Sequence, residues 1–204
     1  MNSTDNKIKI KFILFFVISA IAVFIDRYTK ILAVANLKGR PSYVLIKGVF
    51  EFLYSENRGA AFSILQGKQW FFYIVTLLVL LVIYYIVYKL PFEKKYMPLF
   101  YILCFIFAGA LGNIIDSVFY GVIFDHSVNN VATFMSDEPY GTLFHGRVVD
   151  MLYFPIIDTY LPDWVPFYGG KRFTFFDPIF NVADTAISVA VGLLLIFNKQ
   201  AFKK

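Results

Sequence analysis

The stretch WFFYIVTLLVLLVIYYIVY, from Trp70 to Tyr88, contains no charged residue. A helix needs about 20 predominantly apolar residues to cross the hydrocarbon core of a bilayer. This run is long enough and apolar enough to do so. It therefore predicts a transmembrane helix.

Three further runs have the same character, at about residues 12–35, 97–115 and 179–197. The chain of 204 residues is 59% hydrophobic and 20% aromatic, far more apolar than an average soluble domain. We predict an all-α integral membrane protein whose residues 1–204 form a single membrane domain. Its four transmembrane helices cover about 12–35, 70–88, 97–115 and 179–197, and its long loops cover about 36–69 and 116–177.

The distribution of basic residues predicts the orientation. The net charge of +5 does not indicate nucleic-acid binding, because the lysines cluster at the ends of the apolar runs. One side of the predicted membrane domain carries short segments dense in lysine (Lys7, Lys9, Lys11, Lys89, Lys94, Lys95, Lys199, Lys203 and Lys204). Cytoplasmic segments are enriched in such residues, so both termini are predicted inside and both long loops outside.

The segments outside the main spans leave some alternatives open. The first run can also be read as a cleavable signal peptide, because Lys7 to Lys11 resembles a basic leader region. Tyr43 to Tyr54 is rich in β-branched and aromatic residues around Lys47-Gly48, which predicts a short hairpin. Residues 121–145 are polar and predict a flexible excursion. Residues 148–168 mix aromatics with prolines, a composition that suits the lipid headgroup region.

Two aspartates lie in apolar sequence close to the predicted membrane. Asp150 follows Val148-Val149, and Asp184 follows Asn181-Val182-Ala183, about five residues into the fourth run. A carboxylate at the edge of hydrocarbon is costly and usually faces a polar cavity. Two that meet there cannot both ionise easily, and aspartic proteases share one proton between such a pair to activate water. The pair predicts an aspartic peptidase; for Asp184 alone, a carboxylate stabilised by a helix N-terminus is the structural alternative.

Other polar residues accompany the aspartates. Asp26 and Lys30 are four apart on one helix face and can form a structural ion pair or support a substrate site. Asn113 and Asp116 follow Gly109 and Gly112, whose lack of side chains suits tight helix packing. Asn57 and Gly59 precede the second run, where a plain loop is the alternative. No metal site is predicted for His126 or His145, and Cys104 is predicted to be a buried hydrophobe.

Taken together and in order, the motifs resemble those of lipoprotein signal peptidase, the signal peptidase II family. The matching blocks are Asp26-x-x-x-Lys30, Asn57-x-Gly59-Ala60-Ala61-Phe62, Gly109-Ala110-Leu111-Gly112-Asn113-x-x-Asp116, Val148-Val149-Asp150 and Phe180-Asn181-x-Ala183-Asp184. The resemblance implies Asp150 and Asp184 as the catalytic pair, and Asn57, Gly59, Asn113, Asp116 and Asn181 as substrate-site residues. It implies a supporting role for Asp26 and Lys30.

The same resemblance implies a four-helix enzyme of the bacterial inner membrane with a small outward β-cradle and an interfacial helix. The substrates would be prolipoproteins already carrying a diacylglyceryl group, cut just before the lipidated cysteine at the outer face. Globomycin-type inhibitors are expected to bind. We expect a monomer in contact with membrane lipid, with no cofactor, metal or nucleic-acid partner. The alternatives are a small transporter or channel with an ionisable relay, and a non-catalytic scaffold.

Two features depart from the family pattern. An arginine usually follows the aspartate of the third block, and this chain has Ser117 there. Arg147 is the predicted replacement and a candidate substrate-site residue, because it is the only cation between residues 96 and 170; Arg58 is the next candidate. The stretch 117–147 is also longer than is common between these blocks.

Overall fold

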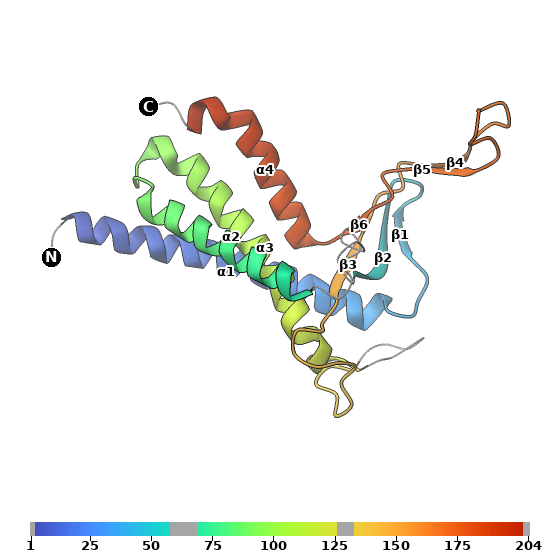
Figure 1. Ribbon diagram of the computed structural model, residues 1–204, viewed down its shortest axis with the longest axis horizontal. Coiled ribbons are helices and arrows are strands. Elements are labelled where there is room, and N and C mark those ends of the chain that lie inside the picture. Colours follow the sequence, from blue (N-terminus) through green and yellow to red (C-terminus); the bar gives the residue numbers. More distant parts are fainter. Residues whose placement is uncertain (1–2, 58–68, 126–132, 202–204) are drawn as a thin grey trace.

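The computed structural model describes residues 3–57, 69–125 and 133–201 (Figure 1). Long helices form a bundle, and a small antiparallel sheet lies at one end of it. The Ser3 end of helix α1 and the Ala201 end of helix α4 both lie at the other end of the bundle, at the left of Figure 1. Polar residues near the sheet are therefore far from both ends of the described chain.

The helices are α1 (Ser3–Leu37), α2 (Gln69–Lys89), α3 (Met97–Ile123) and α4 (Val182–Ala201). Each helix overlaps one of the four predicted apolar runs, with different ends. Helices α1, α2 and α3 are long and apolar enough to cross a membrane, whereas the apolar part of α4, Val182–Phe197, is shorter. Large apolar side chains such as Phe24, Leu81 and Ile196 point outward, as expected for helices that contact lipid.

The main sheet has the strand order β1-β2-β3-β6 and is antiparallel throughout. Its strands are β1 (Tyr43–Ile46), β2 (Phe50–Asn57), β3 (Val148–Tyr153) and β6 (Ile179–Phe180). The predicted hairpin is confirmed by β1 and β2. Gly48 has a φ of +71°, which glycine adopts without steric cost, and Val49 N–H donates to the Ile46 carbonyl at 3.0 Å. Ser55 of β2 lies opposite Asp150 of β3.

Close packing of α4 against α3 depends on two glycines. A Cβ on Gly109 would lie 2.6 Å from the Ala183 carbonyl oxygen, and one on Gly112 would lie 3.2 Å from the Ala183 Cβ and 2.9 Å from an Asp26 carboxylate oxygen. The predicted small-residue face is thus confirmed. It brings the start of α4 against the middle of α3, with α1 beside both.

Two apolar clusters hold the layers together. One fills the bundle between α1, α2 and α3 and includes Phe15, Val87, Phe100 and Cys104, which is buried as predicted. The other lies between the C-terminal ends of α1 and α3 and one face of the sheet (Ala33, Val34, Tyr120, Phe124, Val149 and Met151). This second cluster seats strand β3 directly on the helices, and Asp150 lies within that strand.

The described part of the predicted flexible excursion is bonded to the end of α3, so that prediction needs correction. Helix α3 continues past the predicted end at residue 115 to Ile123. Carbonyls in the last turn of a helix lack intrahelical partners. Here Gly141 N–H donates to the Gly121 carbonyl at 2.8 Å, and Met135 N–H donates to the Ile123 carbonyl at 2.9 Å.

Strands β4 (Ile157–Tyr160) and β5 (Arg172–Phe175) form a separate two-stranded hairpin. It projects beyond the main sheet and away from the helices, at the upper right of Figure 1. The expected interfacial helix is not present among residues 38–57, 124–125 and 133–181. Residues 58–68 and 126–132 lie outside the described parts of the chain.

Candidate active site

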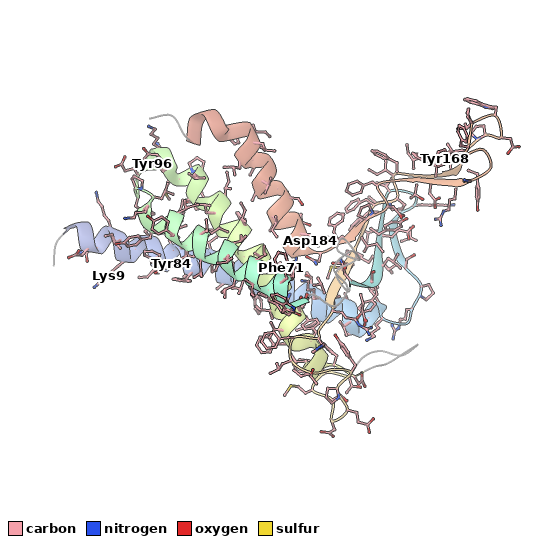
Figure 2. All side chains as sticks on the ribbon, viewed as in Figure 1. Lys9, Phe71, Tyr84, Tyr96, Tyr168 and Asp184 are labelled. Atoms are coloured by element: carbon pink, nitrogen blue, oxygen red, sulfur yellow. The ribbon has the colours of Figure 1, made fainter. Side chains whose placement is uncertain are left out.

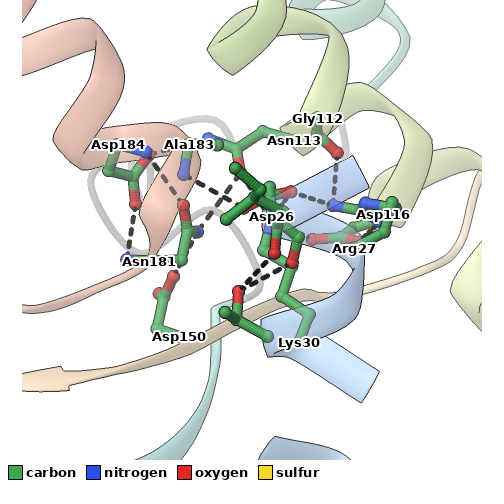
Figure 3. A network of polar contacts seen from close by, with 12 residues as sticks. Asp26, Arg27, Lys30, Gly112, Asn113, Asp116, Asp150, Asn181, Ala183 and Asp184 are labelled. Carbon is green, nitrogen blue, oxygen red and sulfur yellow. Dashed lines mark hydrogen bonds and ion pairs between the residues drawn. The ribbon is translucent and has the colours of Figure 1, made fainter. Parts of the chain in front are cut away.

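Asp150 and Asp184 approach one another where the sheet meets the bundle (Figure 3). Asp150 is in β3 and is only 2% exposed. Asp184 is in the first turn of α4, because that helix begins at Val182. The predicted depth of about five residues into a helix was therefore wrong. The apolar pair Ile179–Phe180, which reads as continuous with the helical run, forms strand β6 against Leu152 and Tyr153.

Asn181 lies between the two carboxylates and is fully buried. Its side-chain oxygen accepts from the Asp184 N–H at 2.9 Å, and its own N–H points at the Asp184 carboxylate at 3.4 Å. This reciprocal arrangement is a capping box at the start of α4. The Asn181 amide nitrogen donates to Asp150 Oδ1 at 2.7 Å. The residue that starts the helix therefore also connects the two aspartates.

Asn113 of α3 joins the same network. Its amide nitrogen donates to Asp184 Oδ1 at 2.7 Å. Its oxygen accepts from Lys30 Nζ at 3.0 Å and from the Asn181 amide at 3.2 Å. Each amide orientation is fixed by these partners, since a flipped Asn113 would place an oxygen against a carboxylate. Asp184 is thereby held by a donor on α3 as well as by its own helix start.

Four charged side chains form a cluster behind this network, three of them buried and the fourth, Arg27, partly buried. Lys30 lies 3.0 Å from Asp26, as the four-residue spacing predicts, and 2.6 Å from Asp116. Arg27 contacts the same two carboxylates, Asp26 at 2.5 Å and Asp116 by a short ion pair, and donates to the Gly112 carbonyl at 2.7 Å. Two acids and two bases balance, which a buried group of charges requires.

Asp26 also reaches the start of α4. Its Oδ1 accepts from the Ala183 N–H at 3.0 Å, one residue before Asp184. The first N–H groups of a helix have no intrahelical partner, so a carboxylate from another helix can satisfy them. The charged cluster of Asp26, Arg27, Lys30 and Asp116 is therefore bonded both to Asn113 and to the backbone that carries Asp184.

Arg147 lies elsewhere, so its predicted place beside Asp116 was wrong. Its guanidinium bonds to Glu56 at 2.5 Å and lies over the Tyr140 ring. Lys38 lies 3.1 Å from the same carboxylate, and the pKa of Glu56 is held below its ordinary value, because the bonds from Arg147 and Lys38 outweigh its burial. Glu56 on β2 faces Val149 across the sheet, which brings it within reach of Arg147.

Arg27 is the site residue that the sequence prediction missed. It occupies the place proposed for Arg147, because the nearest cation in space to Asp116 comes from α1 rather than from the same segment of chain. A signal was available: an arginine within an apolar run cannot face lipid at low cost. Its carboxylate partner had to lie on another helix or beside it.

Asn57 and Gly59 have different outcomes. The Asn57 side chain hydrogen-bonds to Asp150, so it belongs to the site, and its residue pairs with Val148 at the end of β2. Gly59 lies outside the described residues, as do Arg58 and the rest of its block. The site of described residues therefore consists of Asn57, Asn113, Asp150, Asn181 and Asp184, with the charged cluster behind.

The surroundings of Asp150 raise its pKa to about 7. Burial is the largest cause and the nearby negative charge of Asp184 is the next. The amides of Asn181 and Asn57 and the charge of Lys30 oppose the shift. Asp184 lies in the first turn of α4 and accepts from the Asn113 amide. One carboxyl is thus biased toward its protonated form while the other has donors suited to a carboxylate.

No group of three or more His, Cys, Asp or Glu residues suited to a metal ion occurs among the residues that the structure describes. The His145 ring nitrogen contacts Thr142 and the Leu143 carbonyl within its own loop. His126 lies outside the described segments.

An apolar groove runs between α3 and α4, and one of its ends is lined by residues close in sequence to the aspartates. Its volume is about 560 Å³. Val182, Thr185 and Leu152 line the end near Asp184, and Pro98 and Phe197 line the far end. The groove therefore extends along most of the apolar part of α4, at hydrocarbon depth if these helices cross a bilayer.

Comparisons with known proteins agree with this architecture. A family model described as signal peptidase (SPase) II matches residues 18–199. A protein of Porphyromonas gingivalis named lipoprotein signal peptidase is 44% identical over 149 residues, which are 72% of this chain and 66% of the relative. The matched part thus spans just under two thirds of that relative. A lipoprotein signal peptidase of Caldanaerobacter subterraneus is 35% identical over 185 residues, covering 89% of this chain and 95% of the relative.

Two solved structures of bacterial membrane enzymes are similar in fold. One has a TM-score of 0.62 and 26% identity, and the match covers 90% of each chain. The other has a TM-score of 0.63 and 25% identity, with 94% of this chain and 92% of that chain covered. The likeness therefore extends over the helices and the sheet together.

Proposed function

The chain belongs to the signal peptidase II family, and from this premise we propose that it is a membrane aspartic endopeptidase that removes signal peptides from prolipoproteins. Asp150 and Asp184 are its catalytic pair. The observation that carries this proposal is that Asn181 connects the two carboxyls: its side-chain amide donates to Asp150 and its backbone N–H points at the Asp184 carboxylate. The raised pKa of Asp150 keeps one proton in the site near neutral pH.

The two aspartates have different roles. Asp184, negatively charged at the start of α4, takes a proton from a water whose oxygen bonds to the scissile carbonyl carbon. Asp150 gives its proton to the carbonyl oxygen. When the tetrahedral intermediate breaks its carbon–nitrogen bond, Asp184 passes its proton to the leaving nitrogen and Asp150 regains one from the new carboxyl group. Both residues end as they began.

The amides position the reacting groups. Asn113 and Asn181 hold Asp184 and Asp150 in fixed orientations, and Asn57 reaches Asp150 from β2. A peptide bond buried next to these amides requires hydrogen-bond partners of its own. Asn57 at the edge of the site is the candidate to supply one, because it belongs to the sheet rather than to the bundle.

The substrate is a prolipoprotein that already carries a diacylglyceryl group, cut just before the modified cysteine. The apolar groove between α3 and α4 supports a lipid-bearing substrate, since it leads from Thr185, next to Asp184, along the helices. An acyl chain or the apolar part of the signal peptide fits such a surface. Burying its apolar surface in the groove would contribute about 25 cal/mol of favourable binding free energy per Å². Globomycin-type inhibitors are expected to compete for the same site.

The protein acts as a monomer in the bacterial inner membrane. All four helices cross the bilayer, both termini are cytoplasmic, and the site opens at the outer face. The lysines near the start of α1 and between α2 and α3, at the end of the bundle opposite the sheet, support this orientation. A transporter with an ionisable relay is less well supported, because the charged cluster and both aspartates lie together in one polar network near the start of α4.

The direct test is cleavage of a purified diacylglyceryl-modified prolipoprotein by the purified protein in detergent. Asp150→Asn and Asp184→Asn should each lower the rate by about 100-fold or more, the usual contribution of a general acid or base. Asp137→Asn, an exposed loop aspartate, is the control and should retain full activity. EDTA should not inhibit. Full activity in either site variant would disprove the catalytic pair, and loss of activity in EDTA that zinc restores would indicate a metal enzyme.

A further inference from the structure

The hairpin of β4 and β5 is inserted between the two halves of the candidate active site. We call residues 156–176 the arm. Strand β3, which holds Asp150, runs into the arm, and the arm returns through β6 to Asn181 and Asp184. At its base Leu152 pairs with Phe180. Any force that positions the arm therefore acts on the strand and the helix start that carry the two aspartates.

The arm has one apolar face and one polar face. Residues directly opposite one another in an antiparallel pair point to the same side. Ile157 lies opposite Phe175 and Thr159 lies opposite Phe173, so Ile157, Phe173 and Phe175 share a face, and all three are exposed. The other face carries the ion pair of Arg172 with Asp158, with bonds of 2.7 and 2.6 Å.

The tip of the arm presents large aromatic side chains outward. Trp164 is 81% exposed, Phe167 is 92% exposed, and Tyr168 also points away from the protein (Figure 2). Phe167 has a φ of +65°, a left-handed conformation that costs a residue with a side chain roughly 1–2 kcal/mol relative to its ordinary backbone. A glycine would suit this turn better. Phe167 therefore gains nothing for the fold that offsets its strained backbone and its exposed ring.

The described parts of this chain leave the apolar face and the tip exposed. An isolated two-stranded hairpin is at best marginally stable in water. The arm joins a membrane domain: Val182, at the start of α4, follows Phe176 by six positions, and at about 3.5 Å per residue this stretch reaches at most roughly 20 Å. The base of the arm is thus held near the level at which α4 enters lipid.

The chemistry of the arm fits the surface of a bilayer. Aromatic side chains gather at the headgroup level of membrane proteins, where their rings contact both acyl chains and water. Charged residues of the arm balance, with Asp158 and Asp163 against Lys171 and Arg172. A neutral arm with an apolar face does not select a partner by charge. Such an arm suits the surface of the membrane in which the helices lie. That surface is at the level of the helix ends, close to the base of the arm.

We propose that the arm lies on the surface of the same bilayer, with Ile157, Phe173, Phe175 and the aromatic tip in the headgroup region and the Asp158–Arg172 face toward water. The arm is then a membrane-surface anchor. It fixes the height of the Asp150–Asp184 site above the hydrocarbon core. That last consequence rests on the proposed function, whereas the location of the arm does not.

Trp164 offers an intrinsic probe, because the chain has only two tryptophans. In Trp70→Phe protein, reconstituted into phosphatidylcholine vesicles, Trp164 fluorescence should be quenched by lipid brominated near the headgroup more than by lipid brominated deep in the chain. Iodide in the buffer should quench it at least about threefold less than in the detergent-solubilised protein unfolded with denaturant. Full accessibility to iodide with no quenching by brominated lipid would overturn the proposal.

Matched variants test which face is in contact. Phe173→Ser and the tip variant Phe167→Ser should each reduce lipid quenching of Trp164 by about half or more. Tyr160→Ser removes an exposed aromatic from the polar face and should leave it unchanged. The tip variant disrupts no strand pairing, so its effect does not depend on the hairpin remaining folded. Equal loss in all three, or loss only in Tyr160→Ser, would contradict the assignment of faces.

A protein partner predicts a different pattern. Trp164 would then be protected from iodide in native membranes but fully exposed in vesicles of pure lipid, and that result would also overturn the proposal. The experiment measures the depth of Trp164 in the bilayer and does not measure cleavage. A chain that cleaves no prolipoprotein but shows a shielded Trp164 would refute the proposed function and leave the membrane-surface anchor intact.

Discussion

Asp150 and Asp184 have the same functional group and different surroundings, and this difference is the basis of their proposed division of labour. Burial and the charge of Asp184 raise the pKa of Asp150 to about 7. Asp184 lies at a helix start and accepts from Asn113. Pairs of titratable groups whose environments differ in this direction commonly act as acid and base.

The pH dependence of cleavage follows from this division. Asp150 acts as the proton donor, so it must be protonated, and its raised pKa keeps that form populated up to about pH 7. Above that value kcat/KM should fall, by about tenfold per pH unit. The measurement is kcat/KM on a lipidated prolipoprotein from pH 5 to 9 at constant ionic strength. A rate that rises steadily to pH 9 would contradict this assignment and make Asp150 the base.

Arg27 is expected to matter more than Arg147. Arg27→Ala would leave the buried carboxylates of Asp26 and Asp116 with Lys30 alone, and an unbalanced buried charge costs about 3–5 kcal/mol. We expect a lower melting temperature and cleavage reduced by tenfold or more. Ser117→Arg in that background should restore part of both, because position 117 follows Asp116 on the same helix.

Arg147→Ala is the matched control for this prediction. Its guanidinium neutralises Glu56, a residue outside the network of the aspartates, and Lys38 remains to pair with that carboxylate. Cleavage should change by less than about threefold. If Arg147→Ala were as damaging as Arg27→Ala, the contacts of Arg27 would not explain the site.

Sequence spacing predicted some contacts of the site residues and not others. Asp26 and Lys30 were predicted to pair because four residues place them on one helix face. The partner of Asp116 was sought among cations close to it in sequence, and it lies 89 residues away on α1. The spacing of residues along a helix determines which of them share a face. Which residues of two different helices meet depends on how the helices pack against each other, and the spacing within one helix does not show this.

At the scale of elements, the contact of α3 with α4 determines where Asp184 lies. Gly109→Ala would place a Cβ 2.6 Å from the Ala183 carbonyl oxygen and from an Ile187 carbon, so α4 would have to shift. We expect a melting temperature lower by several degrees, consistent with a cost of about 1–3 kcal/mol for overpacking. Cleavage should fall as well, because Ala183 precedes Asp184.

Gly192→Ala is the control for this contact. A Cβ there would have no atom within 4 Å, and alanine favours a helix over glycine by about 1 kcal/mol. The variant should melt at the same temperature or higher and cleave normally. If both glycine variants lose stability equally, helix propensity or expression rather than the α3–α4 contact would be responsible.

Most elements could be predicted from the sequence, and their ends could not. A helix forms over most of each of the four apolar runs, because a long apolar run can bond its own backbone groups as a helix, and Gly48 marks the turn of the β1–β2 hairpin. Ile179–Phe180 could not be separated from the helical run, since an apolar pair suits a strand and a helix equally. The arm was read only as an aromatic, proline-broken stretch, because the pairing of Ile157 with Phe175 spans a long turn without alternation.

At the scale of the whole molecule, orientation and the number of crossings remain predictions with a defined test. The Ser3 end of α1, the connection between α2 and α3 with its lysines, and the Ala201 end of α4 lie at the end of the bundle opposite the sheet. The apolar part of α4 is Val182–Phe197, which at 1.5 Å per residue is about 24 Å long against a core of roughly 30 Å. Local thinning of the bilayer or flanking lysines can accommodate that difference at modest cost.

Single cysteines in a Cys104→Ala background test the arrangement in intact cells with a membrane-impermeant maleimide. Asp137→Cys, in the loop between α3 and β3, should be labelled. Lys7→Cys and Lys199→Cys, in α1 and α4, should be labelled only after the membrane is permeabilised. Labelling of position 199 together with 137 would mean that α4 does not cross. Since Asp184 lies at the start of α4, its site would then need a shallow helix that lies along the membrane, and the α3–α4 groove would face the interface rather than hydrocarbon. Labelling of position 7 but not 137 would invert the protein and place the site in the cytoplasm, where a substrate exported before cleavage could not reach it.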